Sequence, residues 1–225
     1  MSGSHSSPIK VWDWSIRVFH WSLPLLLFLL WRSAGEDMDQ HMLFAQALLA
    51  LVTYRIIWGF IGTPYARFSH FIYHPKYIFR YFLASTKPNK PIYLSHNPVG
   101  GIMVLIILAT LLFQLTTGLF SSDDIFYEGP LYKYASNATA SLMTFLHKKW
   151  FYYGILLIVA MHVLAIVAYR IRGEALVKAM VTGHKRVALD RVADVLPQPT
   201  TFPWGRFVLA LALAALPVWY LFYYI

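Results

Sequence analysis

The sequence predicts an all-α integral membrane protein that crosses the bilayer five times. Of its 225 residues, 58% are apolar and 13% are charged, whereas soluble domains have about 45–50% apolar and about 25% charged residues. A helix needs about 20 apolar residues to cross the hydrocarbon layer. Five stretches reach that length, near residues 15–33, 42–61, 98–120, 149–170 and 206–225. This composition excludes a water-soluble globule and a disordered chain.

The charges of the connecting segments predict the orientation of these spans. The segments after the first and third spans carry six acids against Lys133, and those after the second and fourth spans are rich in Lys and Arg. Because basic loops remain in the cytoplasm, we expect a cytoplasmic N-terminus and a C-terminus on the outer side. Fifteen of the 19 bases then lie on the inner side. The net charge of +9 therefore reflects topology and attraction to anionic membrane lipid, not nucleic-acid binding.

We expect three segments along the chain. Residues 1–10 form a disordered tail, residues 11–190 a transmembrane domain, and residues 191–225 a linker with the fifth span. The polar run Met1–Pro8 lacks the basic region and cleavage site of a signal peptide. The fifth span contains no candidate ligand, so we interpret it as a peripheral helix or a homodimer contact.

The absence of cysteine restricts the cofactors. It excludes disulfides, iron–sulfur clusters, thiolate zinc sites and covalently attached c-type haem. Any redox cofactor must therefore be held by other ligands, and nine histidines are present.

Four histidines lie at two depths of the predicted bundle. His20 and His162 lie toward the cytoplasmic side of the first and fourth spans; His41 opens the second span at the outer face, and His147 lies just outside the fourth. An ionisable side chain in a span is costly and marks a function by default. Fifteen residues separate His147 from His162, which is about 22 Å with a residual rotation of about 60°, so both rings can face the bundle interior. Two antiparallel pairs at matching depths are what two stacked bis-histidine haems require.

Small residues near these histidines have two interpretations. They let a porphyrin approach the backbone, or they simply pack helices against each other. The residues concerned are Ala45, Gly100, Gly101, Gly118 and Gly154.

Further polar residues lie near the inner histidine pair. His96 opens the third span, where it is a helix-entry residue, a haem-propionate partner, a quinone ligand or a substitute iron ligand. Arginine binds carboxylates in a bidentate manner, so Arg17, Arg55 and Arg67 are candidate propionate partners. Lys148 and Lys149 are the outer candidates. All five cations equally fit snorkelling toward lipid headgroups.

Four sequence segments resemble the bacterial cytochrome b561 family, which includes the b-type cytochrome subunits of nickel–iron hydrogenases and superoxide oxidase. VWDWSIRVFHW at residues 11–21 resembles the start of the family's first helix, and RIIWGFIGTPYARF at residues 55–68 resembles the end of its second. HNPVGG at residues 96–101 and AMVTGHK at residues 179–185 resemble the hydrogenase-cytochrome branch. The resemblance covers about residues 10–190.

The resemblance implies a four-helix core with two b haems in the bacterial inner membrane. It implies that His20 and His162 bind the inner haem and His41 and His147 the outer haem. In the family, the two histidines of the fourth helix are one residue closer together than here. Either a helical bulge accommodates the extra residue, or another residue replaces one ligand, with His147 the less secure because it lies at a fraying helix end.

Three functions are compatible with these patterns. The first is a respiratory-chain electron-transfer subunit that links ubiquinone or menaquinone to a periplasmic cytochrome c or to a dehydrogenase or hydrogenase subunit. The acidic outer loops suit a basic partner. The second is an enzyme, a superoxide:quinone oxidoreductase, for which Lys148 and Lys149 offer positive charge. The third is a membrane protein without haem.

Overall fold

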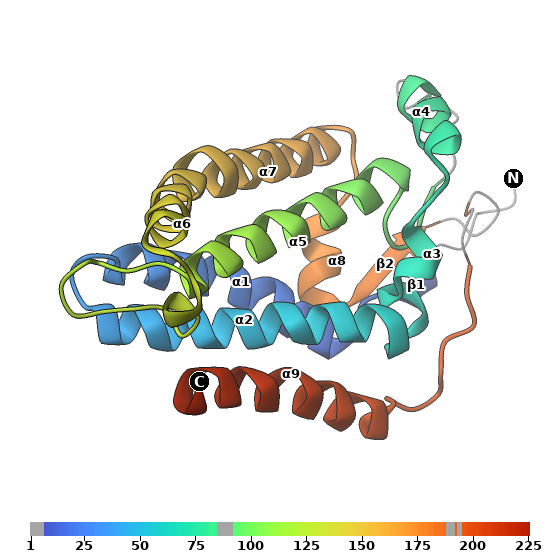
Figure 1. The fold of residues 1–225 in the computed structure, drawn as a ribbon. Coiled ribbons are helices and arrows are strands. Elements are labelled where there is room, and N and C mark those ends of the chain that lie inside the picture. The colour runs from blue at the N-terminus through green and yellow to red at the C-terminus, as the bar shows by residue number, and fades with distance from the viewer. Residues whose placement is uncertain (1–6, 85–91, 188–191, 193–194) are drawn as a thin grey trace, which may run out of the picture.

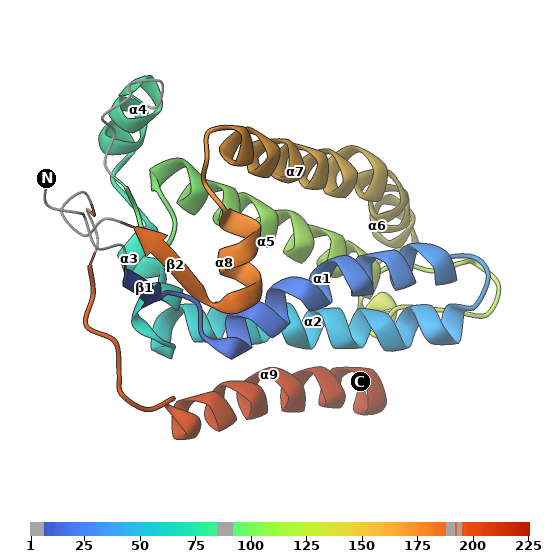
Figure 2. The same cartoon turned by 180° about the vertical axis from the view of Figure 1, so that it is seen from behind.

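A computed structural model describes residues 7–84, 92–187, 192 and 195–225 (Figure 1). Within these residues, five helical segments are long and apolar enough to cross a membrane. They are α1 (Trp14–Ser33), α2 (Met38–Ile61), α5 (Pro98–Leu119), the helical segment α6–η3–α7 (Asn137–Trp150, Phe151–Ile155, Leu156–Ile171) and α9 (Trp204–Tyr224). The segment α6–η3–α7 is continuous but bends between α6 and α7 (Figures 1 and 2). The predicted all-α membrane fold with five spans is confirmed.

The short elements gather mainly at one end of the bundle (Figure 1). These are β1 (Ser7–Lys10), η1 (Pro64–Ala66), α3 (Phe68–Phe71), α4 (Pro75–Ala84), α8 (Leu176–Thr182) and β2 (His184–Val187). We call this the basic end, because it carries the Lys- and Arg-rich connections. The opposite, acidic end carries the α1–α2 turn and the α5–α6 connection, which includes η2 (Tyr132–Tyr134).

The predicted disordered tail is wrong for its last four residues. Strand β1 pairs antiparallel with β2, with Lys10 opposite His184. The pairing continues at Gly183, which ends α8 with a φ of 81° and whose carbonyl accepts from the N–H groups of Val11 and Trp12. Residues 1–6 and the predicted boundary at residues 190–191 lie outside the described residues.

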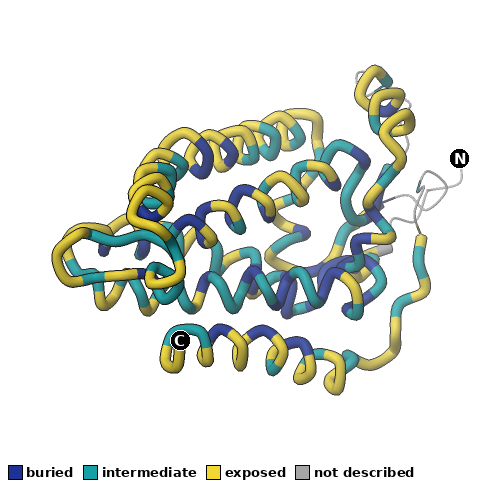
Figure 3. The backbone as a smooth tube through the Cα atoms, in the orientation of Figure 1, coloured by how far each residue is buried: buried dark blue, intermediate teal, exposed yellow. Residues whose placement is uncertain are grey.

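The helices pack in layers around α2. Helix α1 lies along α2, α5 packs on α2 and on α6, and α9 packs on α2 from the side away from α5 and α7 (Figures 1 and 2). Ala210 and Ala214 are fully buried in the α2–α9 contact, since small residues let helix backbones approach closely. Burial is greatest along α2 and α5 and around the basic end, whereas α4 and much of α7 are exposed (Figure 3). The fifth span is thus peripheral to the other four.

Asp13 joins α1 to α2 through a buried hydrogen-bond network. Its carboxylate caps α1 by accepting from the Ile16 N–H at 2.9 Å, and it accepts from the hydroxyl of Ser15 at 2.6 Å. It also accepts from Trp58 Nε1 at 3.2 Å and from Thr63 Oγ1 at 2.5 Å. One side chain therefore fixes the start of α1 against the end of α2.

We expect Asp13→Asn to lower the free energy of unfolding by about 1–3 kcal/mol, the cost of a buried donor left without an acceptor. The amide keeps one oxygen, and the Trp58 N–H cannot reverse its role as a donor. Thermal unfolding in detergent measures the change. Asp124→Asn is the matched control, because Asp124 is exposed. Equal midpoints for the two variants would contradict this role of Asp13.

Candidate functional site

The four predicted histidines lie in two pairs. His20 of α1 faces His162 of α7 with ring centroids 6.2 Å apart, and His41 of α2 faces His147 of α6 at 6.3 Å. Two imidazoles bound on opposite sides of one metal ion by bonds of about 2.0 Å have ring centres about 6 Å apart. Each pair therefore has the separation needed to hold one metal ion between its rings.

The acidic-end pair, His41 and His147, is oriented by backbone carbonyls of neighbouring helices. His41 Nδ1 lies 3.0 Å from the carbonyl oxygen of Leu30, and His147 Nδ1 lies 2.9 Å from that of Gln114. When Nδ1 donates such a bond, Nε2 carries no proton and is the nitrogen that binds a metal. Gln114 adds a bond from Nε2 to the carbonyl of His147 at 3.0 Å. Sequence reasoning missed Gln114, a buried polar side chain within an apolar span.

Two of the small residues lie against aromatic side chains. A Cβ on Gly118 would lie 2.9 Å from the His147 ring, and one on Gly154 would lie 2.5 Å from the Trp150 ring. These glycines thus make room for protein side chains.

His147 lies well inside a continuous helix, so the prediction that it lies just outside the fourth span at a fraying end is wrong. The segment α6–η3–α7 begins at Asn137, and the side chain of Ser136 caps it by accepting from the Thr139 N–H. Residues Phe151–Ile155, between His147 and His162, form a π-helical turn. A π-bulge accommodates one extra residue in an α-helix, which is the first of the two predicted explanations for the 15-residue spacing.

Buried polar atoms without partners gather near the basic-end pair, His20 and His162. Within the described residues, Arg55 Nη1, His96 Nδ1, His20 Nδ1 and Arg17 Nε are buried and form no hydrogen bond. The Arg55 side chain is 3% exposed, and its guanidinium lies 5.0 Å from the centre of the Phe68 ring. Buried polar groups without partners are rare and costly. These atoms therefore point to a ligand that accepts hydrogen bonds.

His96 packs between two aromatic rings. Its centroid lies 4.9 Å from that of Trp12 and 4.6 Å from that of Phe71. Burial lowers the pKa of His96 to about 3, and the Arg55 guanidinium adds to this effect, so the ring is neutral at pH 7. The helix-entry role belongs to its neighbour Asn97, whose side chain accepts from the Gly100 N–H at 2.8 Å.

The other predicted cations differ in their surroundings. Arg17 Nη1 donates to the carbonyl of Val181 at 2.6 Å, and Arg67 Nε donates to that of Gly62 at 2.9 Å. Arg17 therefore joins α1 to α8, and Arg67 joins the segment after η1 to the end of α2. Lys148 and Lys149 are exposed on α6 next to His147.

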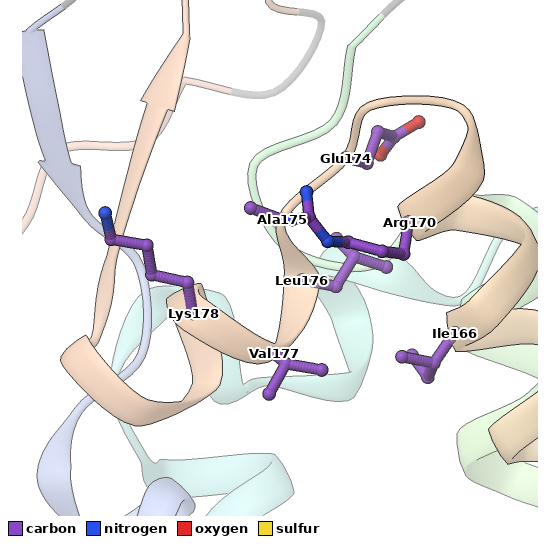
Figure 4. A pocket seen from close by; sticks show the side chains of 7 residues that line it. All are labelled: Ile166, Arg170, Glu174, Ala175, Leu176, Val177 and Lys178. Atoms are coloured by element: carbon purple, nitrogen blue, oxygen red, sulfur yellow. The ribbon is translucent and has the colours of Figure 1, made fainter.

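A pocket of about 340 Å³ lies between α7 and α8 (Figure 4). Its wall on α7 is made by Ile166 and Arg170, which follow His162 at intervals of four residues and so share its helix face. Glu174, Lys178 and three apolar or small residues of the α7–α8 segment complete the lining. The pocket combines apolar walls with two cations and one carboxylate.

The donor set fits an iron porphyrin. Within the described residues, no group of three or more His, Asp or Glu side chains is arranged to hold a metal ion. Each histidine pair could supply two ligands to a six-coordinate metal, and the other four would then have to arrive with the metal. A porphyrin provides these four nitrogens, and its carboxylates are acceptors of the kind that Arg55 and His96 lack.

A family model described as prokaryotic cytochrome b561 matches residues 11–183. The match covers the first four spans and ends before α9. It confirms the resemblance seen in the sequence, including the nickel-hydrogenase cytochrome branch. No curated protein and no solved structure matches the chain.

Proposed function

Because the chain belongs to the prokaryotic cytochrome b561 family, whose members are electron-transferring membrane proteins that bind haem b, we propose that it carries two haems and links quinone to an outer redox partner. The membrane is the bacterial inner membrane, with the basic end in the cytoplasm. The proposal rests on the distances between the ring centroids of the two histidine pairs, 6.2 Å for His20–His162 and 6.3 Å for His41–His147.

In this proposal, His20 and His162 would hold the haem near the cytoplasmic side, and His41 and His147 would hold the one near the periplasm. Haem b supplies a one-electron couple whose potential depends on its ligands and burial. The carbonyls of Leu30 and Gln114 hold the outer imidazoles in the metal-binding tautomer. Arg55 would neutralise a propionate of the inner haem, and the neutral His96 ring would donate a hydrogen bond to one, with Arg17 beside them.

In this proposal, quinone binds in the α7–α8 pocket and exchanges electrons with the inner haem there. The pocket shares the α7 face of His162 and has a size in the range of small-molecule sites. Arg170 offers a donor to quinone oxygens. Lys178 and Glu174 also line the pocket, with their charged ends directed away from Ile166 (Figure 4).

The outer partner is a basic cytochrome c or redox subunit. The loop between α5 and α6 closes on the end of α5, because Leu131 N donates to the carbonyl of Leu119 at 2.9 Å. The Asp39 carboxylate, at the start of the helix α2 that carries His41, raises the pKa of Tyr127 in this loop by its negative charge, so the loop lies close to the start of α2. Asp124 and Glu128 are exposed there, and Phe126 exposes 87% of its side chain. An acidic surface around an aromatic anchor suits steering and docking of a basic protein.

The test couples both sides in one assay. Purified protein with a short-chain ubiquinol and a basic cytochrome c should reduce the cytochrome, and the rate should fall about tenfold or more from low to high ionic strength. Arg170→Gln should slow haem reduction by quinol at unchanged haem content. Failure of quinol to reduce the haems would overturn the proposal, whereas a salt-independent rate would contradict only the docking surface.

The superoxide alternative is decided by the same preparation. Lys148 and Lys149 beside His147 are the observation that favours it. In stopped flow, rapid haem reduction by superoxide that slows in the Lys148→Ala/Lys149→Ala variant would assign the enzyme activity. We expect slow reduction, because Glu36, Asp37 and Asp39 place negative charge at the same end.

A further inference from the structure

Helix α4 has three sides of different chemistry. At 100° per residue, an apolar side, two bases and two tyrosines lie roughly a third of a turn from one another. The apolar side carries Phe79 and Phe82, which expose 64% and 62% of their side chains. Both bases are exposed as well, and α4 contains no acid. The bases are Lys76 and Arg80, and the tyrosines are Tyr77 and Tyr81.

The tyrosine side of α4 is fixed to the protein. Tyr81 is buried, with its ring centroid 5.5 Å from that of Tyr93, and the hydroxyls of Tyr77 and Tyr93 are 2.6 Å apart. Lys185 of β2 donates to the Tyr93 carbonyl at 2.6 Å. These contacts fix the rotation of α4 about its own axis, and with it the directions of the other two sides.

The apolar side of α4 is continuous with the exposed surface of a membrane-spanning helix. A groove of about 380 Å³ lies between α4 and the first turns of α5, and its lining is entirely apolar. Val99 and Ile102 form its wall on α5, and Ile106 follows on the same helix face with 44% of its side chain exposed. Because α5 crosses the membrane from Pro98 onward, the lipid that covers Ile106 extends to the groove and to the apolar side of α4.

Helix α4 lies across the bundle rather than along it. Figures 1 and 2 show α4 beside the start of α5 at the basic end, running across the direction of α2 and α9. Membrane-spanning helices lie within about 40° of the membrane normal, so a helix that crosses their direction at one end of the bundle follows the membrane surface. With ten residues, α4 is also shorter than the about 20 residues that a span requires.

We propose that α4 is an in-plane membrane anchor, whose apolar side is inserted into the lipid leaflet at the basic end. Its tyrosine side rests on the protein, and Lys76 and Arg80 lie in the aqueous headgroup region. Bases on the polar face and Phe on the apolar face are typical of helices that lie in the membrane interface. The occupant of the apolar side is the bilayer that already surrounds α5. The proposal is independent of the haem number, the quinone pocket and the redox partners.

Spin labelling of the full, haem-loaded protein in lipid nanodiscs tests this arrangement. The chain contains no cysteine, so a nitroxide attached to one introduced cysteine reports on that position alone. With Phe82→Cys, the label should be more accessible to oxygen, which concentrates in hydrocarbon, than to a water-soluble nickel chelate. Its depth should be about 5–10 Å within the boundary of headgroups and acyl chains. Arg80→Cys, on the same helix but on the base side, should give the reverse preference.

Further labels provide the calibration and a repeat. Leu213→Cys, 51% exposed within the span α9, gives the value for hydrocarbon, and Asp124→Cys, exposed in the α5–α6 connection, gives the value for water. Phe79→Cys repeats the measurement at a second apolar position, and an unchanged haem spectrum verifies the fold of each variant.

Two results would overturn the proposal. Equal accessibility to the nickel chelate in the Phe82→Cys and Arg80→Cys variants would place the apolar side of α4 in water. Low accessibility to both oxygen and the nickel chelate in the Phe82→Cys and Phe79→Cys variants would show that a protein surface, such as a second copy of the chain, covers this side instead of lipid.

Discussion

Replacing His162 by alanine is expected to reduce the haem content from two to one per chain. His41→Ala should have the same effect, and the double variant should bind none. Each pair would hold one haem, and because the two pairs lie toward opposite ends of the bundle, each site keeps its own ligands. A pyridine haemochromogen assay gives the stoichiometry, and the reduced-minus-oxidised spectrum shows whether the remaining haem is low-spin.

His74→Ala is the matched control, because His74 is exposed between α3 and α4. It should leave both haems in place. One haem in the wild-type protein would contradict the two-site assignment, and the single variants would then show which pair is real. Loss of both haems in each single variant would mean that the pairs are not independent.

Deleting Tyr153 is expected to preserve both haems, while inserting one alanine after Tyr153 is expected to remove one. The reason is the π-helical turn at Phe151–Ile155. Deleting one residue there converts the π turn into an α turn and leaves the faces of α6 and α7 as they are. An inserted residue instead turns His162 by about 100° relative to His147, and no second bulge is present to accommodate it.

The test compares the haem content and the thermal stability of the deletion variant with those of the insertion variant. Tyr153 is 72% exposed, so its removal costs little packing. Haem content and thermal stability of the two variants should differ, with the deletion variant close to wild type. Equal losses in both variants would show that the bulge does not set the register between the two histidines.

The sequence predicted the residues that meet, but not the local structure that brings them together. The histidine pairs followed from topology, because loop charge gives the depth of each ring. The sequence pattern did not predict the start of the fourth helical segment at Asn137. Hydropathy detects only the apolar length of a helix, and residues 137–149 include polar side chains such as Thr139, Ser141 and Thr144. That omission produced the wrong position of His147.

Hydrogen bonds between residues far apart in the sequence could not be predicted from the sequence pattern. Asp13 belongs to a segment that resembles the family, yet its role depends on Trp58 and Thr63, which follow it by 45 and 50 residues. The unpartnered atoms of Arg55 and His96 likewise depend on burial from several elements. Residue type predicted that these two side chains could bind an anion. Only the fold distinguishes Arg55, whose Nη1 has no hydrogen-bond partner, from Arg67, whose Nε donates to the carbonyl of Gly62.

The pairing of β1 with β2 has a consequence for biosynthesis. Lys10 leaves the ribosome early, but its partner His184 is made only after the fourth span and α8. The N-terminal strand therefore stays without its partner strand until nearly the whole family domain has been made. Closure of the two strands joins the first residues of that domain to its last ones, and α9 follows this point in the chain. Because α9 packs on α2 and takes no part in the strand pairing, the two ends of the domain are held together without it.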